Sequence, residues 1–230
     1  MKCVILQPSY IPWRGYFHQI QKADLFIFYD DVQYDKRGWR NRNRIKTPAG
    51  LLWLTIPVFA HGAQVVHTPI YQVSICWDEP WNQKHWKSIQ HSYARAPYFR
   101  KYASMLEEKF MAHPEFLADF TIPLTIDLAR ELGISHTRFM RSSEIPDIRG
   151  AKTDRLIAIL GHVGATNYIS GPSARNYIEA EKFLQAGITL EFMEYNYPEY
   201  NQLYPPFEPQ VSILDLIFMT GPKALDYITG

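Results

Sequence analysis

The sequence predicts an α/β protein whose core is a mostly parallel, Rossmann-like sheet with a helical insertion or subdomain. Short apolar runs that end at polar loops alternate with helical patterns in the first and last thirds of the chain, whereas the middle third has helical spacing throughout. We therefore expect an N-terminal α/β half with a Gln-Pro loop and an Arg-rich hairpin, a helical insertion, and a C-terminal α/β half: residues 1–79, 80–133 and 134–230. The three segments are expected to form a single compact domain, because the chain is only about one and a half typical domain lengths.

The first thirty residues are expected to form a strand, a helix and a second strand. These elements cover residues 4–6, 15–22 and 25–29. The first strand ends at Gln7 and the second at Asp30 and Asp31. A strand, helix and strand in this order build a parallel sheet, in which ligands bind beyond the carboxyl ends of the strands. The polar residues at both ends are therefore candidate ligand contacts.

We predict the later elements from turn sequences and from Pro and Gly residues, which are typical of helix starts and helix ends, respectively. Residues 39–46 and 51–58 are expected to form a hairpin around a Thr-Pro-Ala-Gly turn, and residues 70–75 predict one more strand. The remaining expected elements are helices that begin at residue 80, at 99–111 and at 116–132, a strand at 137–140, a helix at 152–163, a strand at 167–169, a helix at 172–185, a strand at 188–194 and a last helix at 212–218.

Composition and motifs exclude several classes of protein. Lys and Arg (24) nearly balance Asp and Glu (23), and the net charge of +1 excludes the basic coat of a nonspecific nucleic-acid binder. A hydrophobic share of 47% excludes wholesale disorder and fibrous classes. The Walker, GxGxxG, HExxH and GxSxG motifs are absent, so P-loop, standard dinucleotide, zinc-protease and α/β-hydrolase chemistry have no support.

The chain is expected to be cytoplasmic and to lack a membrane span. Its nearly uncharged stretches are too short to cross a bilayer, and its first apolar run is too short for a signal peptide. Cys3 and Cys76 are the two cysteines, which agrees with a reducing compartment and argues against a structural zinc site. No metal site, cofactor or oligomeric state is predicted.

The loop at residues 7–16 combines prolines, a glycine and aromatic side chains. Tyr10, Trp13 and Tyr16 could form a stacking wall for a ligand. Gln7 could supply a hydrogen bond, and Gly15 allows the backbone to approach a ligand closely. The alternative interpretation is a rigid turn whose aromatic rings belong to the core.

Cations alternate with other residues in the predicted strand at 39–46, so that one face would carry Arg40, Arg42, Arg44 and Lys46. The arginine fork fits phosphate oxygens, which predicts a phosphate or diphosphate ligand. A salt-bridge network with nearby aspartates is the alternative. Asn41 and Asn43 face the other way and are candidate hydrogen-bonding residues.

Asp30 and Asp31 end a strand, a common position for a general base. Adjacent residues of a strand point to opposite sides, so at most one of them is expected to face the site, and Asp31 is the candidate base. Capping or salt bridging is the alternative.

His85 is the other candidate base, and we expect it on the polar side of the first long helix. Lys84 or Ser88 would place the acceptor of the reaction. A solvated helical face is the alternative interpretation of this pattern.

Two serine-containing turns are candidate substrate contacts. Ser142 and Ser143 follow a predicted strand, and Ser170 and Gly171 join a strand to a helix N-terminus, where backbone N–H groups can bind an anion. Ordinary helix capping is the alternative for both.

Seven blocks of the chain together resemble the WbqC-like protein family along nearly the whole length: residues 7–17 (QPSYIPWRGYF), 29–33 (YDDVQ), 39–46 (WRNRNRIK), 84–86 (KHW), 141–144 (RSSE), 168–172 (YISGP) and 212–215 (SILD). The resemblance implies a place in bacterial surface-polysaccharide (O-antigen) biosynthesis and a glycine or aminoacyl transferase role on amino sugars. It carries over no catalytic residue, so the candidate residues rest on the chemistry above.

The expected activity is the transfer of a small acyl group, glycyl or aminoacyl, to the amine of a nucleotide-linked amino sugar. This reaction needs a pocket for sugar and diphosphate, a base for the amine, and donors for the oxyanion of the tetrahedral intermediate. The expected partners are a nucleotide sugar and an activated acyl donor, with aminoacyl-tRNA the one nucleic acid considered. The alternative is an accessory protein that binds carbohydrate or nucleotide without catalysis.

Overall fold

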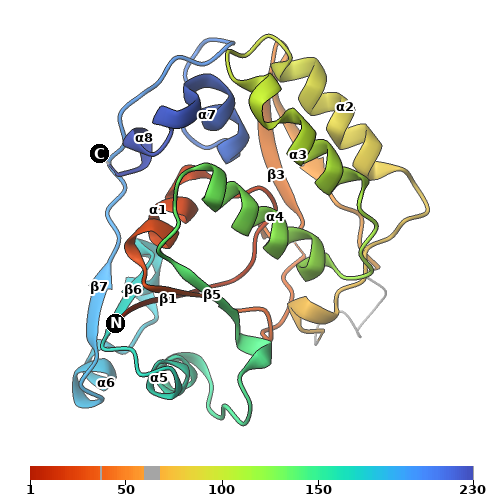
Figure 1. The fold of residues 1–230 in the computed structure, drawn as a ribbon. Helices are drawn as coiled ribbons and strands as arrows, with labels where there is room; N and C mark the ends of the chain where they lie inside the picture. Colours follow the sequence, from red (N-terminus) through yellow and green to blue (C-terminus); the bar gives the residue numbers. More distant parts are fainter. Residues whose placement is uncertain (37, 60–67, 230) are drawn as a thin grey trace.

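The computed structural model describes residues 1–36, 38–59 and 68–229 (Figure 1). Its centre is a five-stranded parallel sheet formed by β1 (Lys2–Leu6), β2 (Leu25–Phe28), β5 (Arg138–Arg141), β6 (Asn167–Ser170) and β7 (Thr189–Phe192). The expected α/β fold with a mostly parallel sheet is therefore confirmed.

The strand order is β5-β2-β1-β6-β7, so the chain builds outward from β1 in one direction and then in the other. In β1, Cys3 pairs with Leu25 of β2 on one side and with Tyr168 of β6 on the other. The order reverses between β1 and β6. In doubly wound sheets, this reversal opens a crevice at the carboxyl ends of the two strands.

The two faces of the sheet are covered by different helices, because successive side chains of a strand point to opposite faces. On one face, Val4, Phe26 and Ile169 belong to a large core that includes α1 (Arg14–Lys22) and α4 (Leu117–Glu131). On the other face, the alternate strand residues pack on α5 (Lys152–His162) and α6 (Ala180–Gln185).

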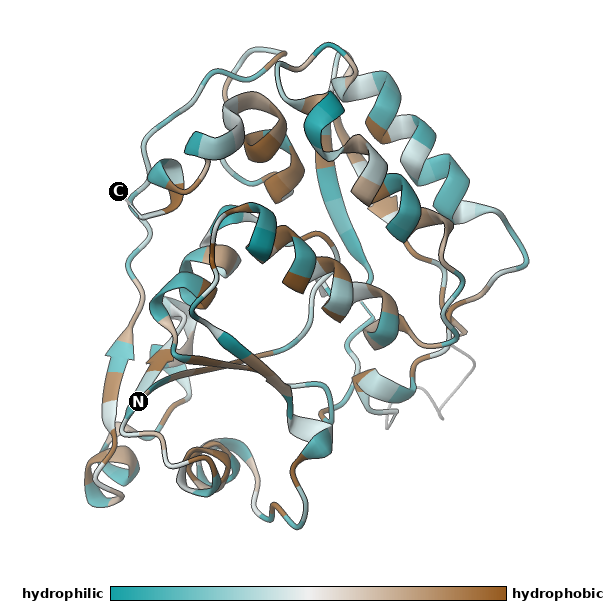
Figure 2. Ribbon diagram, viewed as in Figure 1, coloured by the Kyte–Doolittle hydropathy of each residue, from teal (hydrophilic) through white to brown (hydrophobic). Residues whose placement is uncertain are grey.

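A second layer consists of an antiparallel hairpin and helices. The hairpin strands β3 (Arg42–Thr47) and β4 (Gly50–Thr55) meet at a turn that ends at Gly50, whose φ of 107° suits a residue without a Cβ atom. The helices α2 (Trp81–Tyr93) and α7 (Ile213–Thr220) contact β3. The helix α3 (Phe99–Met111) packs on α2 and α7, and α8 (Asp226–Thr229) packs on α1. Figure 2 shows β3 mainly hydrophilic and α7 mainly hydrophobic, in agreement with the burial of α7 from its first residue to Phe218.

Two expected elements have a different secondary structure from the one predicted. The expected strand at 70–75 is a 3-10 helix (Ile70–Gln72) followed by isolated bridges to two different segments, so no continuous partner strand is present there in the described chain. The expected single helix at 172–185 is divided into a 3-10 helix (Pro172–Asn176) and α6. The division coincides with a tertiary contact, because the backbone N–H of Glu179 donates to Thr153 Oγ1 of α5 (3.2 Å).

The segment 80–133 contains α2, α3 and α4, and its definition as an insertion stays a prediction. None of the helices in the described ranges combines the length and apolar character needed to cross a lipid bilayer.

Candidate functional site

A hollow of about 290 Å³ lies where the strand order reverses. The end of β1 contributes Gln7, the residue after β2 contributes Tyr29, and β6 contributes Tyr168. The other side is formed by the start of α5 and by the segment after the 3-10 helix: Lys152, Thr153, Leu156, Tyr177 and Ile178. This position is the usual ligand crevice of a doubly wound sheet.

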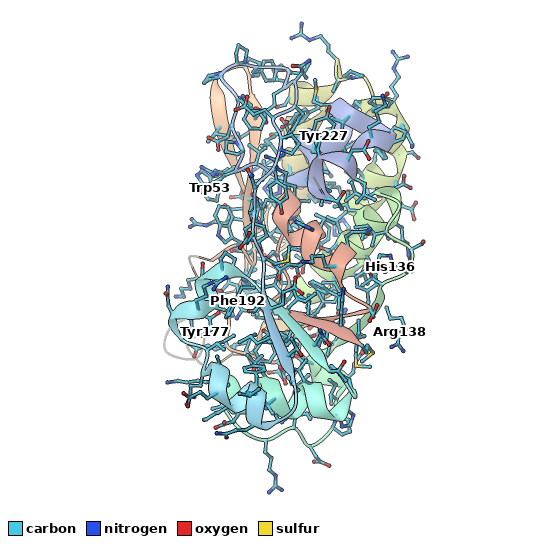
Figure 3. The ribbon with its side chains drawn as sticks, turned by 90° about the vertical axis from the view of Figure 1, so that its left-hand side faces the viewer. Trp53, His136, Arg138, Tyr177, Phe192 and Tyr227 are labelled. Atoms are coloured by element: carbon cyan, nitrogen blue, oxygen red, sulfur yellow. The ribbon has the colours of Figure 1, made fainter. Side chains whose placement is uncertain are left out.

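The lining of this hollow combines apolar side chains, such as Leu6 and Ile178, with a few polar groups that can bind ligand hydroxyls. Burial raises the pKa of both Tyr29 and Tyr168, so their phenols are protonated near neutral pH and can donate hydrogen bonds. Gln7 adds an amide, and Lys152 adds a positive charge. Tyr177 is 68% exposed and stands at the outer boundary of the hollow, on the left in Figure 3.

A cluster of two carboxylates and two serines lies beside this hollow, at the ends of β2 and β5. Ser142 Oγ lies 2.6 Å from Asp31 Oδ1 and 3.2 Å from Asp30 Oδ1. Because one hydroxyl carries one proton, the shorter contact is its donation. Ser143 donates to Asp30 through its backbone N–H (3.0 Å) and its hydroxyl (2.9 Å). Asp30 is fully buried, which raises the pKa of its carboxyl, although the hydrogen bonds oppose this effect.

Asp31 connects the cluster to the hollow. Its Oδ2 forms an ion pair with Arg155 of α5, and Arg155 also hydrogen-bonds the Tyr29 side chain. The expectation that the two aspartates point to opposite sides is wrong, because β2 ends at Phe28 and the strand alternation no longer applies. Both carboxylates contact Ser142. The role of Asp31 as base stays a prediction.

His85 lies on the buried side of α2, so the expectation that it faces outward on the polar side is wrong. Its Nδ1 lies 2.9 Å from the Tyr10 hydroxyl, and Trp81 packs edge-on against its ring. Burial lowers the pKa of His85 to about 4, although a hydrogen bond with the Thr55 backbone opposes this effect. The imidazole is therefore neutral near pH 7, and its assignment as base stays a prediction.

The candidates next to His85 are on the solvent side of the helix. Lys84 forms an exposed ion pair with Glu79 (2.6 Å), and the Ser88 hydroxyl donates to the Lys84 carbonyl (2.9 Å). Neither contact places them at the hollow.

The three aromatic residues expected to form a stacking wall, Tyr10, Trp13 and Tyr16, do not form one surface. Tyr10 and Tyr16 are buried in the core, and Tyr16 donates to the Gln7 carbonyl (3.1 Å). Trp13 is half-buried and packs edge-on against Tyr195, with ring centroids 5.0 Å apart. Gly15 is required there, because a Cβ atom would lie 2.3 Å from the Trp13 indole.

The four cations expected to share one face of a strand, Arg40, Arg42, Arg44 and Lys46, have different partners. Arg40 precedes β3 and is half-buried; it donates to the Pro8 carbonyl (3.1 Å) and lies 3.4 Å from Asp35. Lys46 donates to Gln202 Oε1 (2.6 Å). Arg42 and Arg44 stack over the Trp53 ring, at 4.6 and 5.5 Å from its centroid.

The two asparagines are buried and donate hydrogen bonds to backbone carbonyls. Asn43 Nδ2 donates to the carbonyls of Tyr10 (3.1 Å) and Ile11 (2.8 Å), and Asn41 Nδ2 donates to the Ile56 carbonyl (2.8 Å). The Asn43 contacts hold the hairpin against the loop after β1, whereas the Asn41 contact joins the two arms of the hairpin to each other.

Ser170 and Gly171 lie at the carboxyl end of β6, at the same sheet edge as Gln7. Ser170 is buried and hydrogen-bonds the Tyr168 side chain. A Cβ atom on Gly171 would lie 3.8 Å from the Tyr195 hydroxyl, which is ordinary contact distance.

Several residues of the site were not predicted: Tyr29, Lys152, Thr153, Arg155, Tyr168 and Tyr177. The carboxyl-edge rule could have found Tyr29, which directly precedes Asp30. Tyr168 begins the block at residues 168–172, two residues before the predicted Ser170. The other four residues lie more than a hundred positions after Tyr29 in the sequence, and no block or motif marks them.

A larger hollow of about 430 Å³ lies between α4 and the edge strand β5. Its charged residues are paired, as in Lys109–Asp127 (2.6 Å) and Arg141–Asp119 (2.8 Å). It lies away from the strand reversal, so the smaller hollow is the better candidate site. Among the described residues, no group of three or more His, Cys, Asp or Glu side chains could hold a metal ion.

The strand order and the crevice beside β1 define a doubly wound α/β protein. The chain belongs to the WbqC-like protein family, whose sequence model matches residues 7–227. It is 41% identical over 229 residues to "Uncharacterized protein Rv1507c" of Mycobacterium tuberculosis, an alignment that covers 99% of this chain and 97% of the relative. No solved structure matches the chain significantly.

Proposed function

We propose that this protein transfers a small acyl group, glycyl or aminoacyl, to the amine of a nucleotide-linked amino sugar used in bacterial surface-polysaccharide biosynthesis. The observation that carries this proposal is the hollow at the strand reversal, with Gln7, Tyr29 and Tyr168 in its lining. Amide and phenol groups bind sugar hydroxyls, and aromatic rings stack on sugar faces. The family resemblance supports the polysaccharide context. A cytoplasmic location is part of this proposal.

In the proposed reaction, the amine nitrogen of the sugar attacks the carbonyl carbon of the activated acyl group. A C–N bond forms, the bond between the acyl carbon and the donor's leaving group breaks, and the amine proton passes to a base. We assign the base to Asp31, because Arg155 and Tyr29 connect its carboxylate to the hollow. The turn at Ser170 and Gly171 is the proposed source of oxyanion donors.

A second candidate function is binding without catalysis. It is favoured by the condition of the two candidate bases: the Asp31 carboxylate is in an ion pair, and the pKa of His85 is lowered to about 4. A base with a pKa far below neutral accepts a proton weakly near pH 7. The two functions share the hollow and differ in turnover.

The test has two steps. Titration calorimetry first measures binding of uridine, guanosine and thymidine diphosphate amino sugars, with the Gln7→Ala variant as a control for the hollow. Mass spectrometry then follows each bound sugar mixed with a glycyl thioester, with glycine and ATP, or with glycyl-tRNA. A sugar product heavier by one glycyl residue supports transfer, whereas Gln7-dependent binding without product supports the binding function. Absence of binding by the whole panel would overturn both.

A further inference from the structure

The outer face of the hairpin carries four side chains that we call the indole–guanidinium platform: Trp39, Trp53, Arg42 and Arg44. The two indoles are stacked, with ring centroids 5.5 Å apart and planes 27° from parallel. The Arg42 guanidinium lies over Trp53, and that of Arg44 lies near both rings. Trp39 and Trp53 remain 43% and 44% exposed. Exposed apolar side chains that lie next to one another and are bordered by charged groups are typical of binding sites.

The backbone beneath the platform is fixed by hydrogen bonds. The Tyr10 N–H donates to the Trp39 carbonyl (3.0 Å), and Arg44 Nη2 donates to the Gln210 carbonyl (2.8 Å). Asn43, on the opposite face of β3, anchors the strand to the loop after β1. The platform is therefore a preorganised surface, which lowers the entropic cost of binding.

The platform lies close to the hollow. Gln7 lines the hollow, and Tyr10, three residues later, contacts Trp39. Three residues span at most ~10 Å. Figure 3 shows Trp53 and Tyr177 on the same side of the molecule, opposite His136 and Arg138 at the amino end of β5. The backbones that carry the hollow and the platform therefore lie near each other, on one side of the molecule.

We propose that the platform binds the nucleoside diphosphate part of the nucleotide sugar, while the sugar occupies the hollow; this inference rests on the proposed function. Such a ligand is elongated, with the base at one end, the sugar at the other and two phosphates between them. Indoles stack on nucleobases, and guanidinium groups bind phosphate oxygens. The segment 36–46 contains six Lys or Arg residues and no Asp or Glu, in a chain whose net charge is only +1. This local charge fits one small anion better than an extended nucleic acid.

The test uses titration calorimetry with uridine and guanosine diphosphates and with the matching nucleosides. Trp39→Ala should weaken binding of the tighter diphosphate about 5- to 150-fold, the range of base stacking, and Trp39→Phe should restore most of it. Arg44→Ala should weaken the diphosphate and leave the nucleoside nearly unchanged. Leu52→Ala is the matched control, because Leu52 is exposed on the same hairpin and its strand neighbour Ile45 faces away from the platform. Thermal melts confirm that each variant is folded.

The outcomes separate the inference from the proposed function. If nucleotide sugars bind and Gln7→Ala weakens them, but Trp39→Ala and Arg44→Ala do not, the platform inference is wrong and the proposed function survives. If no diphosphate or nucleotide sugar binds, both fail. A CCA trinucleotide, the single-stranded end of a tRNA, is titrated as a further probe. If it binds through Trp39 and no diphosphate binds, the platform serves single-stranded RNA and the inference is overturned.

Discussion

The Tyr10 hydroxyl and Nδ1 of His85 lie 2.9 Å apart, and this hydrogen bond joins the loop after β1 to helix α2. Burial lowers the pKa of the imidazole and raises that of the phenol, so both groups are neutral near pH 7. A neutral ring has one acceptor and one donor nitrogen, and a carbonyl can only accept. Tyr10 therefore donates to Nδ1, and the donor nitrogen serves the Thr55 backbone.

Tyr10→Phe should destabilise the protein by about 1–3 kcal/mol, because it leaves a buried acceptor nitrogen without a partner. Urea denaturation measures the change. Tyr177→Phe is the control, since Tyr177 is mostly exposed and should change stability by less than about 0.5 kcal/mol. Equal stability of Tyr10→Phe and the parent protein would show that the buried hydrogen bond contributes nothing.

The low pKa of His85 predicts a loss of stability in mild acid. In the unfolded chain the imidazole titrates near 6.5, whereas in the folded protein its pKa is about 4. Between these values the unfolded state binds more protons, so stability falls as pH falls, by up to roughly 3 kcal/mol. Above about pH 6.5 the ring is neutral in both states and the effect vanishes.

Comparison with His85→Gln isolates this effect from other titrating groups. Denaturation at about pH 7.5 and about pH 5 should show a smaller acid-induced loss in the variant than in the parent protein. An identical loss in the two proteins would mean that His85 titrates normally in the folded state.

Much of the fold could be predicted from the sequence, because the sheet strands are short apolar runs that end at polar residues, prolines or glycines. β2 is buried at every position, and the start of α3 at Phe99 and its end at Met111 were both predicted. The failures occurred where tertiary contacts decide the structure. Residues 70–75 have the composition of a strand, but they pair with two different segments through isolated bridges. One long helix was expected at residues 172–185, but the backbone of Glu179 bonds to α5 instead.

The site was only partly predictable for a similar reason. Asp30 and Asp31 were found because they end a strand, and the structure brings them to Ser142 and Ser143, which were also predicted. Arg155 was missed, because a charge 124 residues away in sequence has no local signal. His85 was placed on the wrong face of α2, since its polar neighbours gave no indication of the buried Tyr10 hydroxyl.

Gly15→Ala should destabilise the protein by about 1–3 kcal/mol, as for overpacking of a filled space. The new Cβ atom would lie 2.3 Å from the Trp13 indole, which would have to move from its contact with Tyr195. Gly161→Ala is the matched control, because Gly161 is inside α5 with open space around it and should gain up to about 1 kcal/mol. Thermal melts and tryptophan fluorescence check both; a stable Gly15→Ala protein with unchanged emission would contradict the close approach.

Asp31→Asn should abolish most of the proposed transfer while substrate binding persists. An amide cannot accept the amine proton as a carboxylate does, and general-base assistance contributes roughly 10²–10⁴-fold to a rate. The control is Asp154→Asn, which removes an exposed carboxylate of α5 that pairs with Lys182. Single-turnover product formation measures the rate, and calorimetry measures binding. If Asp31→Asn keeps full turnover and His85→Ala loses it, the base is His85, reached through movement of Tyr10. If both variants turn over normally, neither the Asp31 carboxylate nor the His85 imidazole is the base, and the assignment is wrong.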